Sequence, residues 1–324
     1  MTDTYTVDKG QEFKQLPEIS NIEVCSACNL ECPMCLRTTH LGRQPGLVNM
    51  KLIKLMHERG DFEGTTYTEL QMAGEPTLHP KLFDIIRYLQ GEVGVLVGLS
   101  THGLEIEKRD VLQSVLHLDA LTISVDSVNP EVYAKMRVPG KLQDLYRNLD
   151  LLFGECAELM FRHSNRKVLP MIELQLVQTD LVAGSGDVEA LQKVMKEKGW
   201  DKYAVIRTIK DCFEGMQDRV QINTTQGLCL NPFTAVSVAH NGDVVSCCMI
   251  FTPDPKEYNY YGNLYTKSLK EIWEGQHPKT LQGFMLDHAC NRTALPDQCG
   301  KCTVRSPNLI HQQIVSRLVK MRNV

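Results

Sequence analysis

Apolar runs alternate with amphipathic, helix-like segments along the first two thirds of the chain. Six apolar runs predict strands, at 19–25, 67–73, 93–101, 120–126, 171–179 and 203–209. The segments between them predict helices, at 50–59, 80–90, 107–116, 129–136, 141–153 and 187–198. Strands that alternate with helices imply right-handed crossovers and a parallel sheet. The length used, about 190 residues, favours an open six-unit α/β barrel over a complete eight-unit one.

Several of these strands carry polar side chains at alternate positions. The polar sets are Glu69 and Gln71, Ser100 and His102, Thr122, Ser124 and Asp126, and Glu173 and Gln175. Side chains two residues apart share one face of a strand. Either those faces are solvated, or the barrel interior is polar and holds a ligand. Solvated faces are scarce in a parallel sheet covered by helices, so we favour the ligand.

The alternation changes after residue 209. Residues 233–248 predict a hairpin, because His240-Asn241-Gly242 is a strong tight-turn signal between two valine-containing runs. Helices are predicted at 268–274, 278–287 and 308–322. The predicted fold class is therefore α/β, a partial (β/α)6 TIM-type barrel with a small C-terminal α+β lobe. We divide the chain into an N-terminal extension (1–18), the barrel (19–210), the lobe (211–305) and a C-terminal helix (306–324).

Composition narrows the class of partner and the compartment. The chain has 324 residues, a net charge of −4 and a pI of about 6.2, so no broad basic face for nucleic acid is expected. No apolar stretch reaches the roughly 18 residues that span a bilayer. The first ten residues are polar, which argues against a secretory signal. We expect a cytoplasmic protein without a membrane partner, whose thiols stay reduced.

The 12 cysteines are unusual for such a protein. They gather near both ends, and only Cys156 and Cys212 lie between Cys35 and Cys229. Disulfides explain this distribution poorly in a large chain in a reducing compartment. Ligation of a metal or an iron–sulfur cluster explains it better.

The first group is Cys28-Asn-Leu-Glu-Cys32-Pro-Met-Cys35. Three thiolates at this spacing can each bind one iron of a 4Fe–4S cluster and leave the fourth iron open. The segment resembles the motif of the radical S-adenosylmethionine (SAM) superfamily, with Met34 where an aromatic residue is usual. A zinc site is the alternative, with Cys25 or His40 as a fourth ligand.

The resemblance extends to the predicted strand ends. Gly74-Glu75-Pro76 resembles the family's Gly-Glu-Pro motif, which implies that its carbonyls and the Glu bind the methionine amino group of SAM. A proline turn is the alternative interpretation. Ser124 and Asp126 resemble the positions that contact the ribose or the methionine carboxylate. By the same resemblance, Ser100 and Met34 are expected to line the SAM site.

The second group lies in the C-terminal lobe. Cys229 is followed by 12 residues, Gly242, four residues and Cys247, and then by a distal Cys299-x-x-Cys302. This arrangement resembles the "twitch" domain, a short form of the SPASM domain, which implies a second 4Fe–4S cluster with four cysteine ligands. Structural zinc is the alternative, and Cys290 is an alternative to Cys299. We interpret Cys248 as a core or spare thiol, and Cys25, Cys156 and Cys212 as buried small hydrophobic residues.

The resemblance implies a chemistry. Radical SAM enzymes form a 5′-deoxyadenosyl radical that abstracts a substrate hydrogen, and a flavodoxin or ferredoxin is the expected electron donor. An auxiliary cluster that takes up an electron implies an oxidoreductase that turns an alcohol into a ketone on a sugar or aminocyclitol. The cysteine spacing is most similar to that of the twitch-type dehydrogenase of butirosin biosynthesis. Only 27 residues precede Cys28, which we interpret as too few for a peptide-recognition domain.

The alternative is a peptide maturase of the radical SAM/SPASM type that cross-links or epimerises its substrate. In either case we expect Arg207, Glu173 and His102 to act on the substrate. Arg207 can hold an oxygen or a carboxylate, although a structural salt bridge explains it equally well. His102 has a suitable pKa for a proton acceptor, although a structural histidine is at least as good an interpretation.

Overall fold

The computed structural model describes residues 16–40, 42–163, 169–179, 186–210, 229–251, 254–289, 299 and 302. The strands are β1 (Glu18–Ile22), β2 (Tyr67–Glu69), β3 (Leu96–Thr101), β4 (Ala120–Ser124), β5 (Met171–Gln178), β6 (Ala204–Lys210), β7 (Ala235–Val238), β8 (Asp243–Val245) and β9 (Tyr260–Asn263). The α-helices are α1 (Leu36–His40), α2 (Met50–Glu58), α3 (Leu82–Tyr88), α4 (Arg109–Leu116), α5 (Pro130–Met136), α6 (Leu142–His163), α7 (Asp187–Lys198), α8 (Asn231–Thr234), α9 (Leu269–Trp273) and α10 (Gln276–Ala289). Short 3-10 or π turns are η1 (Pro76–Leu78), η2 (Leu89–Val93) and η4 (Trp200–Lys202).

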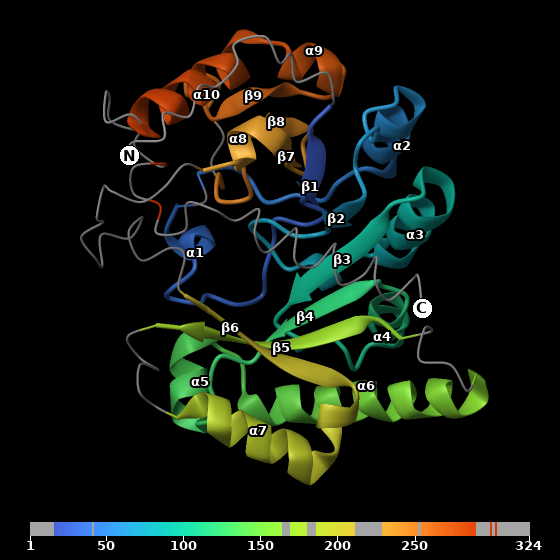
Figure 1. Ribbon diagram of the computed structural model, residues 1–324. Coiled ribbons are helices and arrows are strands. Elements are labelled where there is room, and N and C mark those ends of the chain that lie inside the picture. Colours follow the sequence, from blue (N-terminus) through green and yellow to red (C-terminus); the bar gives the residue numbers. More distant parts are fainter. Residues whose placement is uncertain are drawn as a thin grey trace, which may run out of the picture.

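One sheet joins all nine strands, in the order β6-β5-β4-β3-β2-β1-β7-β8-β9 (Figure 1). Strands β1 to β6 pair in parallel in the order of the chain. This arrangement confirms the predicted α/β class and the partial barrel with a C-terminal lobe. The domain boundaries at 18, 210 and 305 stay predictions.

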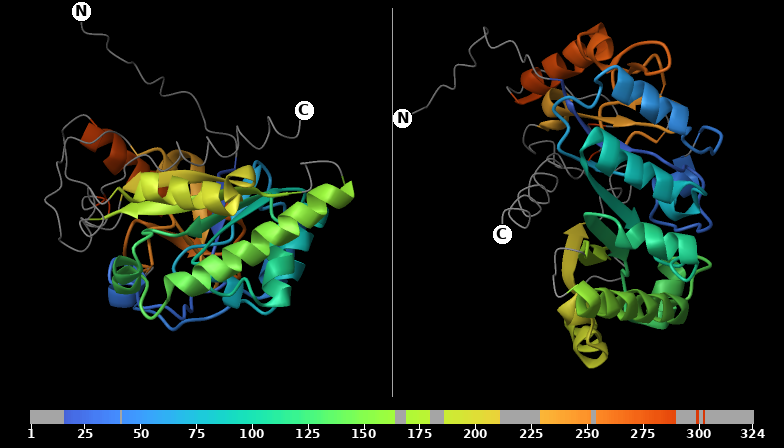
Figure 2. Two further views of the ribbon diagram at one scale, coloured as in Figure 1. Left: turned by 90° about the horizontal axis from the view of Figure 1, so that it is seen from below. Right: turned by 90° about the vertical axis from the view of Figure 1, so that its right-hand side faces the viewer.

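The helices pack along one side of the curved sheet. In Figure 2, α2, α3 and α6 follow one another down that side, in blue, teal and green. At the ends of the sheet, α6 and α7 lie below β5 and β6, whereas α9 and α10 lie above β9 (Figure 1). The opposite, concave side of β1 to β6 faces away from these helices.

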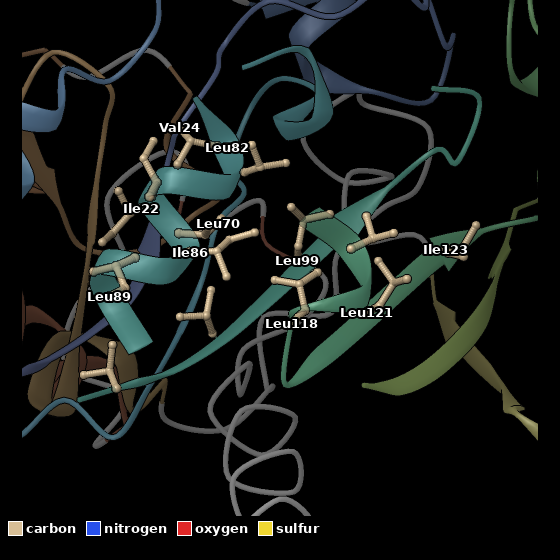
Figure 3. Packing of buried hydrophobic residues seen from close by; sticks show 14 of the residues in the cluster. Ile22, Val24, Leu70, Leu82, Ile86, Leu89, Leu99, Leu118, Leu121 and Ile123 are labelled. Atoms are coloured by element: carbon tan, nitrogen blue, oxygen red, sulfur yellow. The ribbon is translucent and has the colours of Figure 1, made fainter. Parts of the chain in front are cut away.

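The core lies between the sheet and these helices. On α3 and just after it, Leu82, Ile86 and Leu89 point toward Leu70 and Ile22 from the sheet (Figure 3). All five side chains are at most 3% exposed. Burial of each such side chain contributes about 1.5–3 kcal/mol, so this layer stabilises the packing of α3 on the sheet.

An apolar cluster forms the floor of the concave face. A separate small cluster consists of Tyr67, Leu96 and Ala120, with Met171 packed against it, at the amino ends of β2 to β5. The strand register places polar residues above this floor, because Ser100, Thr122 and Glu173 are successive partners across β3, β4 and β5. The prediction of a polar barrel interior thus agrees with the face on which these residues lie.

The C-terminal lobe is continuous with the barrel. Strand β7 pairs in parallel with β1, and β8 and β9 extend the sheet in antiparallel fashion. The predicted hairpin at 233–248 is therefore confirmed, although its first strand is also the outer neighbour of the first barrel strand. A parallel pair between segments more than 200 residues apart leaves no periodic signal in either segment.

Buried charges reinforce this joint. The Glu23 carboxylate, 0% exposed, accepts from Arg43 Nη2 at 2.6 Å, from Ala73 N at 3.2 Å and from His240 N at 3.1 Å. Arg43 Nε also donates to Phe251 O at 2.7 Å. Burial alone raises the pKa of Glu23, but the hydrogen bonds from His240 and Arg43 lower it to about 2. Glu23 follows β1 and His240 forms the β7–β8 turn, so the network ties the lobe to the barrel.

Among the described helices, none combines the length and the apolar character needed to cross a bilayer. The predicted helix at 308–322 lies outside the described residues, as does most of the N-terminal extension.

Candidate functional site

Cys28, Cys32 and Cys35 lie in the loop between β1 and α1. Cys32 is 6% exposed, and the thiols of Cys28 and Cys35 are each within electrostatic range of it. Burial raises the pKa of Cys28 to about 11 and also raises the pKa values of Cys32 and Cys35. Metal ligation requires thiolates, so a cation that binds these three groups would release their protons.

A residue that the sequence did not single out shapes this loop. Arg37, in α1, donates to three backbone carbonyls, those of Ser26 at 3.3 Å, Leu30 at 3.3 Å and Cys28 at 3.2 Å. Its guanidinium presents a rigid fork of donors and can therefore hold several carbonyls at once. The spacing of the cysteines gives no sign of this role, although an arginine two residues after the last cysteine was the available clue.

Asp126 and Arg137 meet beside Cys32. Both Nε and Nη2 of Arg137 bind Asp126 Oδ2, and Nη1 lies 3.8 Å from Cys32 Sγ. Asp126 Oδ1 accepts from Val177 N at 3.1 Å. Asp126 has a φ of 62°, a left-handed conformation that costs free energy in a residue other than glycine. The resemblance implied that Asp126 contacts SAM. In the structure, the Asp126 carboxylate is 0% exposed and pairs with Arg137. The sequence analysis did not single out Arg137.

Gly74 allows two backbone segments to meet. A Cβ atom at this position would lie 2.4 Å from Cys25 O and 2.5 Å from Ala27 O. Glu75 N donates to Ala27 O at 2.8 Å, so the Gly-Glu-Pro segment is fastened directly to the start of the cysteine loop.

The Glu75 side chain points into the protein, 3% exposed. Its carboxylate accepts from Thr77 Oγ1 at 2.6 Å, from Thr101 Oγ1 at 2.7 Å and from His102 N at 3.0 Å. Pro76 begins η1, for which Glu75 is the N-cap. The main-chain atoms of this motif are therefore better placed than the Glu75 side chain to contact a ligand beside the cysteine loop.

His102 is hydrogen-bonded at both ring nitrogens. Leu104 N donates to Nδ1 at 3.0 Å, so Nε2 carries the proton and donates to Asn29 Oδ1 at 2.8 Å. Burial lowers the pKa of His102, which is 3% exposed. Since Asn29 lies in the cysteine loop, these contacts favour the structural interpretation of His102 over the role of proton acceptor.

Charged side chains lie together on the concave face of the sheet. Arg207 Nη1 on β6 is 3.0 Å from Glu173 Oε2 on β5. On β2, Tyr67 Oη donates to Glu69 Oε1 at 3.2 Å, and Gln71 Nε2 donates to Glu69 Oε2 at 2.8 Å. Burial and the nearby Glu69 and Glu173 carboxylates raise the pKa of Tyr67 well above its ordinary value.

The remaining predicted SAM-site residues lie at two places. Ser100 and Ser124 lie on the concave face, where Ser124 is the register partner of Gln175. Met34 is half-buried in the turn between Cys32 and Cys35. All of these positions are at or near the carboxyl ends of the barrel strands, which is the usual place for a site in such a sheet.

The second group of thiols surrounds Cys247, just after β8. Cys248, Cys299, Cys229 and Cys302 are all within electrostatic range of Cys247, whose pKa burial raises well above its ordinary value. Cys302 N donates to Cys299 O at 3.4 Å, which closes the Cys-x-x-Cys turn. Five thiols from three segments of the lobe thus converge on one place.

Cys248 differs from the other thiols of this group. Burial raises its pKa to about 12, and the Glu69 carboxylate on the concave face raises it further. Cys248 is therefore within electrostatic range of both the barrel interior and Cys302 of the second thiol group. Cys25 and Cys156 are 2% and 0% exposed, as predicted for small hydrophobic residues, whereas Cys212 and Cys290 lie outside the described residues.

Two buried tyrosine hydroxyls fit a bound group at the two thiol sites. Neither Tyr133 Oη nor Tyr261 Oη has a hydrogen-bond partner within the described part of the chain. The charges of Arg137, Asp126 and Cys32 act electrostatically on Tyr133. The thiols of the second group act in the same way on Tyr261. A buried hydroxyl without a partner lowers the stability of the folded protein. The sulfides of an iron–sulfur cluster or the oxygen atoms of SAM would supply acceptors at these two places.

The ten described cysteines form no disulfide with one another. Among the described residues, no three His, Cys, Asp or Glu side chains come close enough to share a single metal ion. Of the two fourth ligands considered for zinc, Cys25 donates to Ala27 O at 3.4 Å, and the His40 side chain lies outside the described residues.

Comparison with protein families decides between zinc and iron–sulfur chemistry. Residues 22–155 match the radical SAM superfamily, and residues 229–303 match an iron–sulfur cluster-binding domain, SPASM. The chain therefore contains a radical SAM domain and a SPASM domain. These domains make it an enzyme that uses SAM and iron–sulfur clusters, and the two matches fall on the two thiol groups described above.

Curated relatives cover only part of the chain. The GTP 3′,8-cyclase of Chlorobaculum tepidum is 25% identical over 168 residues, 49% of each chain. A protein of Pyrococcus furiosus that modifies the cofactor of tungsten-containing aldehyde ferredoxin oxidoreductase is 31% identical over 83 residues, 25% of this chain and 23% of that one. The chain spans about half the length, or less, of these relatives.

Solved structures share the whole fold at low sequence identity. BtrN in complex with AdoMet and 2-DOIA has a TM-score of 0.56 at 16% identity, over 90% of this chain and 94% of that one. Native anSMEcpe with bound AdoMet has a TM-score of 0.55 at 16% identity, over 94% and 98%. SuiB from Streptococcus suis, bound to SAM, has a TM-score of 0.54 at 11% identity, over 89% and 71%. These likenesses establish the fold of barrel and lobe together.

Proposed function

We propose that this enzyme is an oxidoreductase that removes two electrons from a small polar molecule, as in the oxidation of an alcohol to a ketone. One observation carries the proposal. Cys247 and Cys248 come just after β8, which the sheet joins through β7 and β1 to the barrel, and the Glu69 carboxylate on the concave face acts electrostatically on Cys248. An electron acceptor held in the lobe would therefore lie on the same sheet as the barrel interior.

The chain offers a ligand set for each cluster. Cys28, Cys32 and Cys35 would hold one 4Fe–4S cluster with an open iron, and Cys229, Cys247, Cys299 and Cys302 would hold a second, closed one. When bound, SAM and the open cluster supply a 5′-deoxyadenosyl radical, and the closed cluster supplies a one-electron acceptor. Arg137 provides a positive charge beside Cys32, where a carboxylate of SAM would be held.

The side chains of the concave face would orient the substrate. Arg207 Nη1 and Glu173 Oε2 pair with each other at 3.0 Å. A substrate that enters between them would place its oxygen against Arg207 and its hydroxyl proton against Glu173. The alcohol must lose one hydrogen atom from carbon, one proton from oxygen and one electron to become a ketone. Glu173 is 3% exposed, so water has little access to the proton-accepting oxygen.

The negative charge of the concave face favours some classes of substrate over others. The carboxylates of Glu69 and Glu173 lie near Tyr67, and Arg207 is paired with Glu173. Such a face repels a triphosphate, so we do not extend the nucleotide substrate of the GTP 3′,8-cyclases to this chain. A neutral or cationic polyol, such as a sugar or aminocyclitol, fits it better.

A peptide substrate is the second candidate, and the open side of the barrel favours it. Val205, whose register partner is Glu173 on the concave face, is 53% exposed on the edge strand β6. An extended chain has access to the face from this side. SuiB, which shares the fold, has a structure bound to its precursor peptide.

The test is anaerobic reconstitution followed by turnover with SAM and a reductant, either flavodoxin with its reductase or dithionite. We expect about eight iron and eight sulfide per chain, and a product that has lost two hydrogens. A product of unchanged mass would indicate epimerisation and contradict the oxidation. Fragmentation of a peptide product separates a cross-link from a ketone.

Replacement of Cys28, Cys32 and Cys35 together by Ala should abolish formation of 5′-deoxyadenosine while about half of the iron remains. The matched control is Cys156→Ala, because Cys156 is buried on α6 away from both groups. Continued 5′-deoxyadenosine formation by the triple variant would mean that the catalytic cluster has been assigned to the wrong cysteines.

A further inference from the structure

Tyr261 carries a buried hydroxyl without a hydrogen-bond partner in the described part of the chain. The residue is 7% exposed on β9, and its Oη atom has no hydrogen-bond partner among the residues that the structure describes. An unsatisfied buried hydroxyl costs about 1–3 kcal/mol, and phenylalanine would avoid this cost. The hydroxyl therefore points to an acceptor that the described residues do not supply.

The β8–β9 pair directs this side chain. Val244 pairs with Gly262 and Val245 pairs with Tyr260, so Tyr261 is an extra residue in the ladder, a β-bulge. Bulges turn a side chain away from the regular alternation of a strand, and they occur often beside functional sites. The Tyr261 ring rests edge-on against Trp273 of α9, with centroids 6.1 Å apart, which fixes the direction of its hydroxyl.

The second thiol group lies near this side chain. The charged groups that act on Tyr261 are all cysteines, namely Cys247, Cys299 and Cys229 in order of strength. A phenol hydroxyl carries a proton that it can donate, and sulfur is a hydrogen-bond acceptor.

We propose that Tyr261 Oη donates a hydrogen bond to a sulfur atom of the cluster held by Cys229, Cys247, Cys299 and Cys302, and thereby raises the reduction potential of that cluster. The proposal rests on the proposed second cluster. Hydrogen bonds to the sulfurs are among the main determinants of cluster potentials, because they stabilise the more negative, reduced state.

The proposed hydrogen bond has a direct consequence for the reaction. A cluster with a higher potential is a better acceptor for an electron that leaves the substrate. Tyr261 would then be a positioning residue that favours oxidation without touching the substrate.

The test compares Tyr261→Phe with Tyr260→Phe in the full chain whose Cys28, Cys32 and Cys35 are replaced by Ala, so that only the second cluster is present. Tyr260 is a matched control, because it is the neighbouring residue on β9 and its hydroxyl binds Asp243 at 3.3 Å instead. The cluster potential is measured by a redox titration followed by electron paramagnetic resonance.

We expect Y261F to favour the oxidised cluster by about three- to tenfold, a potential lower by about 30–60 mV at 59 mV per factor of ten. Y260F should leave the potential unchanged. In addition, one exchangeable proton coupled to the reduced cluster should disappear in Y261F and remain in Y260F.

Two outcomes would overturn the proposal, and they differ in what else they affect. An unchanged potential and an unchanged proton coupling in Y261F, at full iron content, would refute the role of Tyr261 and leave the proposed function intact. Absence of any cluster from the triple-alanine background would refute the second cluster itself, and with it both proposals.

Discussion

Gly74 shows how strictly a single position can be determined by the approach of two backbone segments. Its Cα lies so close to residues 25–27 that a Cβ would meet two carbonyl oxygens at 2.4–2.5 Å. Neither carbonyl is the end of a flexible side chain, so one of the segments must move to admit any other residue. The segment that would move begins the loop of Cys28.

We therefore expect Gly74→Ala to destabilise the protein by about 1–3 kcal/mol and to reduce the iron bound at the first site. The measurements are iron content after reconstitution and the thermal unfolding of the same samples. Gly154→Ala is the matched control, because nothing lies within 4 Å of its added Cβ inside α6. That exchange should be neutral or stabilising. Full iron content in G74A would show that the close approach has no bearing on the cluster loop.

The connection between β4 and α5 depends on one buried ion pair. Asp126 follows β4, Arg137 follows α5, and their side chains are 0% and 14% exposed. Arg137 follows α5 and also lies beside Cys32. Loss of the ion pair would therefore affect the positions of both α5 and the cysteine loop. Removal of one partner leaves a buried charge without compensation, which is more harmful than removal of both.

We expect Asp126→Asn to lower the free energy of unfolding by about 3 kcal/mol, because asparagine accepts the left-handed backbone but leaves Arg137 unpaired. The double variant D126N/R137M should regain a large part of this loss. Denaturant unfolding of the wild type, both single variants and the double variant gives the coupling energy directly. Additive effects of the two substitutions would mean that the ion pair contributes nothing to stability.

The predicted and observed bounds of the helices and strands agree where the bounds depend on neighbouring residues in the sequence. The strand predicted at 120–126 is observed at Ala120–Ser124, and the helix predicted at 187–198 has those bounds, because hydrophobic periodicity is a local property. The helix predicted at 141–153 continues to His163, since nothing in its sequence stops it before then. The pairing of β1 with β7 was not predictable, because it joins residues about 216 positions apart.

The residues of the candidate site also fall into those that the sequence predicted and those that it did not. The first three cysteines and Gly74-Glu75-Pro76 were found from spacing, because their chemistry depends on neighbours in the sequence. Arg37, Arg137 and Tyr261 were missed. Each acts through groups that only the folded chain brings near, and an isolated arginine or tyrosine carries no periodic or motif signal.

At the scale of the whole molecule, the two thiol groups belong to one continuous sheet. Cys247 and Cys248 of the second group follow β8, which is joined through β7 to β1, and the first group lies in the loop after β1. The relative position of the two groups is therefore set by strand pairing and by the Glu23 network, and not by a linker. Loosening of the network should disturb both groups together.

Glu23 provides the pH-dependent test of this joint. Its folded pKa of about 2 is lower than the ordinary value of 4.5, so its ionised form stabilises the folded state. This stabilisation, about 3 kcal/mol, is complete at pH values well above 4.5 and disappears as the pH falls from about 4.5 to about 2. The wild type should therefore lose its advantage over Glu23→Gln in acid, by about 2 kcal/mol between pH 5 and pH 3.

Urea unfolding of both proteins across that pH range measures this difference. Glu92→Gln, an exchange of the same kind at an exposed position in η2, should follow the wild-type pH profile. If E23Q also followed it, the carboxylate would not be the group that holds the lobe against the barrel. If the stability of E23Q departed from the wild-type pH profile as expected, the joint between the lobe and the barrel would depend on the Glu23 charge and its contacts with Arg43 and His240. After reconstitution, E23Q should then bind less iron at both thiol groups than the wild type.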